Sequence, residues 1–361
     1  MIKSMIYFTV LLMISIAAAN RSTERKFRKR MFKTYEARYG KKYRSSAELN
    51  YRTELYEKHM EEIEKFNKEN HSWKQGETIF TDMTDEEKKN FLGLFALDEE
   101  NEADDSFPVT TEGAETQNDA PLLSGSTSPM LGSAAFSSLP QRVNWVTAGI
   151  ITPVKHQGQC GSCWAFTATA LVESLYKRKY GYDLNLSEQE LVDCATHSPY
   201  LNYGCRGGFN TNGLNYYKVK GSRLESQYPY RARDGSCRVL NAASYKISNY
   251  NTIKPRSLVE LLKALSEGPV AVAYFVANDF YNYRSGIYSH KAGCRNSTTV
   301  NHAVLAVGYD LNSRNPHIIF KNSWGTNFGE DGYFRMSMDL IDFGNGPCNL
   351  LKYRMSVAAT L

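Results

Sequence analysis

Seven cysteines constrain the fold of this 361-residue chain more than any other feature of its sequence. In an oxidising compartment cysteines pair as disulfides, and an odd number leaves one thiol over. That thiol is then either a link between chains or a chemical tool. The cysteines are Cys160, Cys163, Cys194, Cys205, Cys237, Cys294 and Cys348.

Residues 1–19 predict a signal peptide for the secretory pathway. Lys3 precedes an apolar run from Met5 to Ile16, and the small residues that signal peptidase accepts follow it up to Ala19. The apolar run is too short to cross the roughly 30 Å core of a bilayer as a helix, so we expect no membrane span. We therefore expect a lysosomal or extracellular protein whose cysteines form disulfides.

Charge and composition divide the remaining chain. Residues 20–138 hold 18 basic and 23 acidic side chains, whereas residues 139–361 hold 24 and 15. Residues 98–138 are acidic and rich in Ser, Gly and Pro, and such a composition buries too little apolar surface to offset the entropy of ordering. We predict a flexible linker there that carries a maturation site. The basic part has no stripe of interleaved basic and aromatic residues, so we expect no nucleic-acid partner.

Residues 20–97 predict a helical domain. Apolar side chains recur every four residues from Phe27 to Tyr39, and a second series runs from Glu48 to Asn67 with spacings of three or four. Both spacings keep the side chains on one helical face. We expect two amphipathic helices packed against each other.

Residues 139–361 predict helices first and strands second. The run from Cys163 to Tyr180 is apolar at its start and ends in basic residues followed by a glycine, as a buried helix does. Later apolar runs are punctuated by Gly, Asn and Asp, which is typical of strands. We expect an α+β fold with a helical lobe at about 148–252, a β-rich lobe at about 253–355 and a cleft between them.

The stretch GQCGSCWAF, residues 158–166, leaves three interpretations of Cys160 and Cys163 open. A redox pair would open a helix, but no βαβ pattern precedes this one. A zinc site would need a second pair at ligand spacing, and Cys194 and Cys205 are eleven residues apart. The third interpretation is one structural thiol beside one nucleophile. It fits Cys163, because a helix N-terminus stabilises a thiolate, and it requires no metal and no cofactor.

A nucleophilic thiol needs a base and a group that orients the base. His302 opens the strand-like run HAVLAVGY, and Asn322 and Trp324 lie in KNSWG after another apolar run. Taken singly, His302 is more typical of a structural histidine, Asn322 of a turn and Trp324 of a core. Spacing alone therefore leaves this set a hypothesis.

Four motifs together resemble the papain family of cysteine peptidases, of the cathepsin L kind. They are QGQCGSCWAF (157–166), GCRGG (204–208), NHAVLAVGY (301–309) and KNSWG (321–325). The N-terminal part is similar to the inhibitory prosegment of that family. GETIFTD (76–82) follows its G-x-N-x-F-x-D motif with Thr78 for Asn, and a second series follows its ERFNIN motif: Glu48, Arg52, Tyr56, His59, Ile63 and Asn67. The resemblance implies a papain-like two-lobed fold preceded by a helical prodomain.

The resemblance also implies the catalytic roles. Cys163 would attack the scissile carbonyl, and His302 would serve as base and then as acid. Asn322 would orient the imidazole under Trp324, and the Gln157 amide with the Cys163 N–H would form the oxyanion hole. The thiolate–imidazolium pair would exist before substrate binds, with a thiol pKa of roughly 3–4. The implied disulfides are Cys160–Cys205, Cys194–Cys237 and Cys294–Cys348.

The substrate groove follows from the same resemblance. Gly207 and Gly208 would form a wall along which an extended peptide bonds to bare backbone. The main specificity pocket would hold Phe209, Ala273, Val300 and Tyr353, with Asn301 at its rim. None of these is acidic, so we expect an apolar residue two places before the cut and weak acceptance of arginine. Tyr353 is bulky and would make the pocket shallow. No histidine-bearing insertion of the cathepsin B type follows the helix, which favours endopeptidase action.

Restraint would come from the prosegment, which in the family threads the cleft in the non-productive direction. We expect this acidic segment to dock electrostatically on the basic catalytic unit. Protonating its carboxylates, Asp82 included, would loosen it in acid, so that the zymogen cuts itself within residues 91–138. The expected partners are protein and peptide substrates and cystatin-type inhibitors, and we expect a monomer. Asn185 and Asn296 begin glycosylation triplets.

One alternative belongs to another functional class: a papain-like fold kept as a binding or storage protein without turnover. The intact Cys163, His302, Asn322 and Gln157 argue against it. Asn144, where the family often has Asp, is a departure from the pattern.

Overall fold

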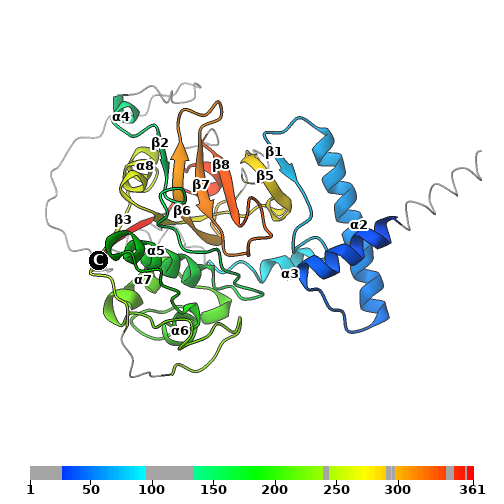
Figure 1. Cartoon of the computed structure of the whole chain (residues 1–361), viewed down its shortest axis with the longest axis horizontal. Coiled ribbons are helices and arrows are strands. Elements are labelled where there is room, and N and C mark those ends of the chain that lie inside the picture. Colours follow the sequence, from blue (N-terminus) through cyan, green and yellow to red (C-terminus); the bar gives the residue numbers. More distant parts are fainter. Residues whose placement is uncertain are drawn as a thin grey trace, which may run out of the picture.

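The computed structural model describes residues 27–94, 134–238, 244–289, 294, 297–338, 345–353 and 356–361. The predicted signal peptide, most of the predicted linker and Asn296 lie outside these residues. Within them, a helical prosegment packs beside a unit of helices and one mixed sheet (Figure 1). No helix in this described part is both long and apolar enough to cross a membrane.

The prosegment contains both predicted helices. One covers residues 27–39, and the other is α2 (Ser46–Lys68), whose N-cap Ser45 accepts a hydrogen bond from the Glu48 amide. They cross at the right of Figure 1 and share a small aromatic core built around Phe32, Tyr35 and Tyr56. A strand and a short helix follow them, namely β1 (Trp73–Gln75) and α3 (Asp85–Lys89).

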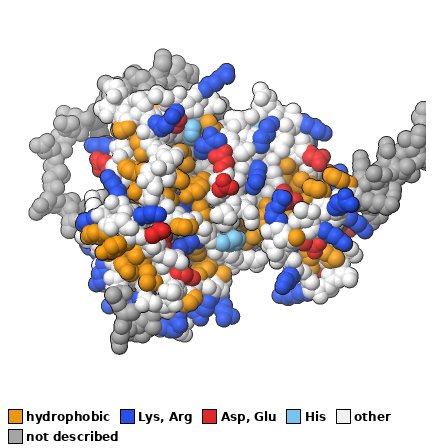
Figure 2. All heavy atoms as spheres, viewed as in Figure 1, with side chains coloured by type: hydrophobic (Ala, Val, Ile, Leu, Met, Phe, Trp, Pro, Cys, Tyr) orange, Lys and Arg blue, Asp and Glu red, His pale blue; other side chains and the backbone are white. Residues whose placement is uncertain are grey.

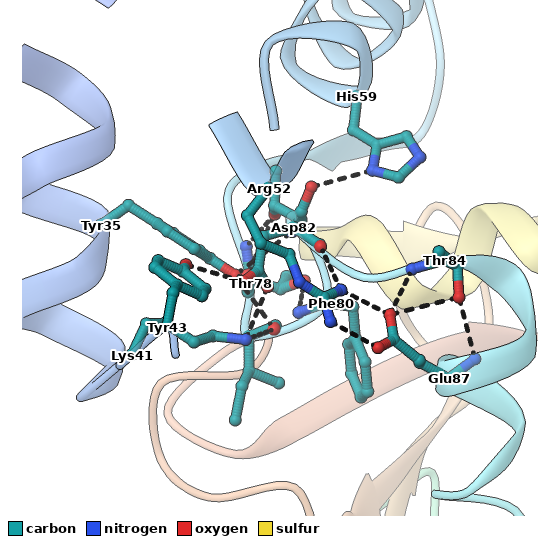
Figure 3. Close-up of polar contacts among 12 residues, drawn as sticks. Tyr35, Lys41, Tyr43, Arg52, His59, Thr78, Phe80, Asp82, Thr84 and Glu87 are labelled. Atoms are coloured by element: carbon teal, nitrogen blue, oxygen red, sulfur yellow. Dashed lines mark hydrogen bonds and ion pairs between the residues drawn. The ribbon is translucent and has the colours of Figure 1, made fainter. Parts of the chain in front are cut away.

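Asp82 lies at the centre of a polar cluster inside the prosegment (Figure 3). Its carboxylate accepts hydrogen bonds from Tyr35 Oη and Lys41 Nζ, both at 2.6 Å, and from Tyr43 Oη at 2.8 Å. Nearby, Arg52 pairs with Glu87 through two hydrogen bonds of 2.5 and 2.6 Å. All of these partners belong to the prosegment, so the cluster stabilises the fold of the prosegment itself rather than its contact with the catalytic unit.

The catalytic unit has helices on both faces of a sheet that contains nine strands when β1 is included. Its helices are α4 (Ala134–Ser137), α5 (Cys163–Tyr180), α6 (Glu188–Cys194), α7 (Asn210–Val219) and α8 (Leu258–Glu267). Its strands are β2 (Arg142–Asn144), β3 (Asn249–Thr252), β4 (Val270–Tyr274), β5 (Tyr283–Tyr288), β6 (His302–Asp310), β7 (His317–Lys321), β8 (Tyr333–Ser337) and β9 (Val357–Thr360). The strand order is β1-β5-β8-β7-β6-β4-β9-β3, and β2 pairs with β6.

Strand β6 brings the parts of the site together. Eight of its nine residues are buried, because α5 packs against it and α8 lies nearby. One core joins α5, α6 and α7 to β6, and a second core lies under α8 and the aromatic side of the sheet. The unbroken apolar pattern of HAVLAVGY therefore reflects a strand that is covered on both faces.

All seven cysteines lie in the described residues, and six of them form the three pairs that the resemblance implies. These are Cys160–Cys205, Cys194–Cys237 and Cys294–Cys348. Cys163 is the free one. The odd cysteine of the sequence is therefore the one that begins α5.

The expectation of electrostatic docking is wrong for the part of the prosegment that the structure describes. Residues 27–94 hold 15 basic and 13 acidic side chains, and basic groups lie on both parts of the molecule in Figure 2. Among the described residues, every ion pair lies within the prosegment or within the catalytic unit. The acidic excess belongs to residues 98–119, which the structure does not describe.

Strand pairing and aromatic packing join the prosegment to the catalytic unit instead. Strand β1 pairs antiparallel with β5, and Thr78 Oγ1 donates to the Tyr281 carbonyl at 2.8 Å. The ring of Phe80 lies edge-on to Tyr281 and to Trp324, each with ring centroids 4.9 Å apart. Thr78, the departure from the family motif, thus makes a cross-interface bond of its own.

Candidate active site

Cys163 is the first residue of α5 and is fully buried. Helix N-termini favour a thiolate, and the backbone N–H groups of Trp164 and Ala303 face its sulfur. Ala303 follows His302 in β6, so the packing of α5 on β6 brings the thiol and the imidazole strand together. This arrangement depends on tertiary packing, since the two residues are far apart in the chain.

His302 is held by two contacts. Its Nε2 bonds to Asn322 Oδ1 at 2.9 Å, and the indole of Trp324 stacks on its ring with centroids 4.7 Å apart. Antiparallel pairing of β6 with β7 brings Asn322, which follows β7, back beside His302. The other ring nitrogen, Nδ1, has no partner among the described residues. The imidazole therefore keeps one free nitrogen while the other is fixed.

Gln157 is oriented by Ser323. Ser323 Oγ donates to Gln157 Oε1 at 2.7 Å, which turns the amide nitrogen Nε2 the other way. That nitrogen donates to the carbonyls of Phe91 at 3.0 Å and Cys160 at 2.8 Å. A prosegment carbonyl thus takes the donor that the resemblance assigns to the oxyanion.

The prosegment crosses the thiol at Gly93. The Gly208 amide donates to the Gly93 carbonyl at 2.9 Å, and Leu94 and Gly208 form a parallel bridge. A Cβ added to Gly93 would overlap the carbonyl group of Gly161 and lie 2.6 Å from its Cα, so the two backbones touch just before Cys163. Only glycine fits this approach.

The predicted pocket residues surround Leu94. Leu94 is buried in a cluster with Cys163, Ala273, Val300, Ala303 and Tyr353, against which Phe209 packs. Asn301 accepts the amides of Gly93 and Leu94 through its carbonyl oxygen, both at 3.3 Å. Gly207 and Gly208 lie on the other side of the prosegment chain, at the end of the Gly204–Arg206 turn. The structure therefore brings all seven predicted groove residues to one site.

Two comparisons by family identify these parts. Residues 139–357 match the papain family cysteine protease domain, and residues 32–87 match the cathepsin propeptide inhibitor domain (I29). The chain belongs to the papain family of cysteine proteases. It is a papain-like cysteine endopeptidase with its own inhibitory prosegment, and hence a zymogen.

Relatives cover most of this papain-family chain. Cysteine proteinase 3 of Solanum lycopersicum is 35% identical over 321 residues, which are 88% of this chain and 82% of the relative. The digestive procathepsin L2 proteinase of Tenebrio molitor has a TM-score of 0.75 and 30% identity, over 92% of this chain and 100% of that one. The Carica candamarcensis protease CMS1MS2, solved with E-64, has a TM-score of 0.55 and 36% identity, over 62% of this chain and 99% of that one.

Burial controls the electrostatics of this zymogen's site. Burial raises the pKa of the Cys163 thiol to about 11 and lowers the pKa of His302 to about 4. Both groups are therefore neutral at neutral pH while the prosegment is in place. The expected thiolate–imidazolium pair, with its depressed thiol pKa, does not describe this form. It remains a prediction for the enzyme after the prosegment has left.

Sequence reasoning missed two supporting residues of this papain-family site. Ser323 was visible in KNSWG, between Asn322 and Trp324, but nothing in the linear pattern connects it to Gln157. The Tyr230 hydroxyl donates to the Gln157 carbonyl at 2.7 Å and lies 2.6 Å from Ser162 Oγ. No motif that we identified signalled Tyr230.

Two further points concern this family member. Asn144, the departure from the usual Asp, accepts the amides of Val146 and Thr147 through Oδ1, a role that needs only an oxygen acceptor. Asn185 is exposed before α6 and remains a predicted glycosylation site. Among the described residues no cluster of His, Cys, Asp and Glu could hold a metal ion.

Proposed function

We propose that this enzyme hydrolyses peptide bonds by a Cys163–His302–Asn322 mechanism in the secretory pathway, in lysosomes or outside the cell. The observation that carries the proposal is the 2.9 Å bond from His302 Nε2 to Asn322 Oδ1 under Trp324, on the strand that faces the thiol. The fixed imidazole keeps Nδ1 free to exchange a proton with sulfur.

Departure of the prosegment starts the chemistry. Water returns to the site, so the desolvation that keeps both groups neutral is lost, and the proton moves from Cys163 Sγ to His302 Nδ1. The thiolate then attacks the substrate carbonyl carbon while Gln157 Nε2 and the Cys163 N–H bond to the oxyanion. His302 gives its proton to the leaving amine, and water releases the acyl group with His302 as base.

The prosegment itself supports an apolar preference two residues before the cut. Leu94 fills the pocket of Ala273, Val300 and Tyr353, which contains no charged side chain to pair with arginine. Tyr353 Oη donates to the Thr298 carbonyl at 2.7 Å, which holds the ring in the pocket. We expect leucine to be preferred over arginine, and a peptide panel with the opposite order would contradict this.

Acid maturation must come from the prosegment rather than from the catalytic pair. The pair holds one proton in either form, on sulfur when closed and on nitrogen when open, so its opening takes up no proton. His59 is different. It is buried, its Nδ1 bonds to the Thr81 carbonyl at 2.8 Å, and burial lowers its pKa. Since the unfolded segment binds a proton more tightly, prosegment stability falls as the pH drops below about 6.5.

Glu87 acts at lower pH. Its hydrogen bonds with Arg52 hold its pKa at about 2, so the stability that it contributes is present above about 4.5 and is lost as the pH falls towards 2. The polar cluster around Asp82 works in the same direction, because protonation of that carboxylate would weaken bonds inside the prosegment. We infer maturation within residues 91–138 in acid, and equal processing rates at neutral and acid pH would contradict it.

Labelling with an epoxysuccinyl inhibitor tests the function. We expect modification at Cys163 after acid treatment, together with cleavage of leucine-containing peptides, because CMS1MS2 was solved with E-64. A Cys163→Ala variant is the control and should be neither labelled nor active. Labelling without turnover would favour the binding protein over the enzyme. We further propose that the mature enzyme is a monomer open to cystatin-type inhibitors.

A further inference from the structure

The prosegment divides the cleft at Gly93. Leu94 follows Gly93 and fills the pocket that the proposed function gives to the acyl side of the substrate. Phe91 precedes it, and its carbonyl accepts from Gln157 Nε2 at 3.0 Å. The surface that Phe91 covers is therefore the leaving side, which receives the residues after the cut.

His156 lies on that surface. It precedes Gln157, its backbone pairs with that of Trp324, and its ring lies edge-on to Phe91 with centroids 6.5 Å apart. A Cβ added to Gly325 would come within 2.9 Å of His156 Cδ2, so the ring packs on a bare stretch of backbone. The side chain is exposed even with the prosegment in place.

Hydrogen bonding fixes which nitrogen of His156 faces the groove. Nδ1 accepts the Gly158 amide at 2.8 Å, so this nitrogen carries no proton in the neutral ring. Nε2 then carries the N–H and is the atom left for a ligand. Protonation requires Nδ1 to give up that amide bond or share it, and the proton adds a full charge to an exposed ring.

The charged surroundings of His156 belong to the prosegment. Desolvation by the packed chain lowers its pKa most, Lys41 is the charged group that lowers it further, and Phe91 is the neighbouring ring. The other described neighbours, Trp324, Gly325 and Gly158, are uncharged, and no described carboxylate bonds to the ring. Loss of the prosegment removes Lys41 and Phe91 together, which leaves a water-exposed histidine with a pKa near the ordinary value of about 6.5.

We propose that His156 is a specificity-determining residue of the mature enzyme, whose protonated ring selects a carboxylate one or two residues after the cut. This inference rests on the proposed function. The carboxylate comes either from an Asp or Glu side chain or from the free C-terminus of a short leaving fragment.

The preference has a defined pH window. His156 is charged below about pH 6.5 and a glutamate carboxylate above about pH 4.3, so attraction is greatest between these values. The pair is exposed to solvent, and exposed ion pairs are weak. We expect a change of about two- to fivefold in kcat/KM rather than an absolute requirement.

Matched peptides test the inference. Internally quenched substrates with Leu two residues before the cut carry Glu or Gln at the first or second position after it, each as C-terminal acid and amide. The measurement is the Glu-to-Gln ratio of kcat/KM at about pH 5 and about pH 7.5 for the mature enzyme. His156→Asn keeps an acceptor for the Gly158 amide but cannot be charged. His197→Asn is the control, since His197 is exposed and bonds to Thr196.

We expect the ratio to rise about two- to fivefold on acidification in the natural enzyme and the His197→Asn variant, and to stay flat in His156→Asn. A flat ratio in the natural enzyme, or an equal rise in His156→Asn, would overturn the inference. A rise confined to peptides with a free C-terminus would assign the carboxylate to the end of the chain. Failure to cleave even the Gln amide peptides would instead overturn the proposed function, and the inference with it.

Discussion

Gly93 is where a single methyl group should separate the prosegment from the nucleophile. In Gly93→Ala the new Cβ would overlap the carbonyl oxygen and carbon of Gly161 and lie 2.6 Å from its Cα. All three are backbone atoms of the loop that precedes Cys163, so no side-chain rotation can relieve the overlap. The chain must lift from the thiol, and we expect Leu94 to leave its pocket with it.

Two interactions that hold this part of the prosegment in the cleft set the magnitude. Removing Leu94 from its buried position costs about 2 kcal/mol, and breaking the Gly208-to-Gly93 hydrogen bond costs about 1 kcal/mol. Together, about 3 kcal/mol favours the open form about a hundredfold. Leu94→Ala removes only the pocket contact, so its effect should be about thirtyfold and smaller than that of Gly93→Ala.

The assay is alkylation of Cys163 in the intact zymogen at neutral pH by an epoxysuccinyl inhibitor, followed by mass spectrometry. Only open molecules react, so the rate reports the open population. Gly40→Ala is the control, because a Cβ at Gly40 meets no atom within 4 Å although its φ of 62° makes the substitution mildly strained. A Gly93→Ala zymogen that is labelled no faster than the natural one would refute the reasoning.

Three further substitutions probe other parts of the molecule. His59→Gln can still donate to the Thr81 carbonyl but cannot take up a proton, so we expect zymogen processing at about pH 5.5 to slow severalfold, as followed by gel electrophoresis, with unchanged processing contradicting the role of His59. Ser323→Ala frees the Gln157 amide to rotate away from the oxyanion, so kcat should fall about tenfold with KM nearly unchanged; a rise in KM alone would argue against this. Tyr353→Ala deepens the pocket, and the preference for Phe over Leu two residues before the cut should rise about tenfold in a fluorogenic peptide panel, whereas a constant ratio would remove Tyr353 from the pocket.

The linear sequence was sufficient for parts whose chemistry is local. Helix periodicity predicted both prosegment helices, because a face repeats every three or four residues whatever it packs against. The odd cysteine count required a free thiol, and Cys163 at the start of an apolar helix was the natural choice. The three disulfides, by contrast, came from family resemblance, since spacing alone allows many pairings.

Total charge was a poor guide to docking. The sequence before residue 139 is acidic overall, yet residues 27–94 are slightly basic and contact the catalytic unit through β1 and Phe80. A charge total does not say where the charges lie once a chain has folded. Strand pairing and aromatic packing depend on which surfaces meet, and no short stretch of sequence contains that information.

The sequence by itself determined which atoms can react: one thiol at a helix start, one imidazole, and the amides of Asn322 and Gln157. Only the tertiary structure decided their state. Ser323 turns the Gln157 amide, Gly93 lies on Gly161, and the prosegment keeps water from Cys163 and His302, so that both are neutral. The physical reason is that a pKa depends on how far a group is removed from water, and here the segment that removes it comes from a distant part of the chain.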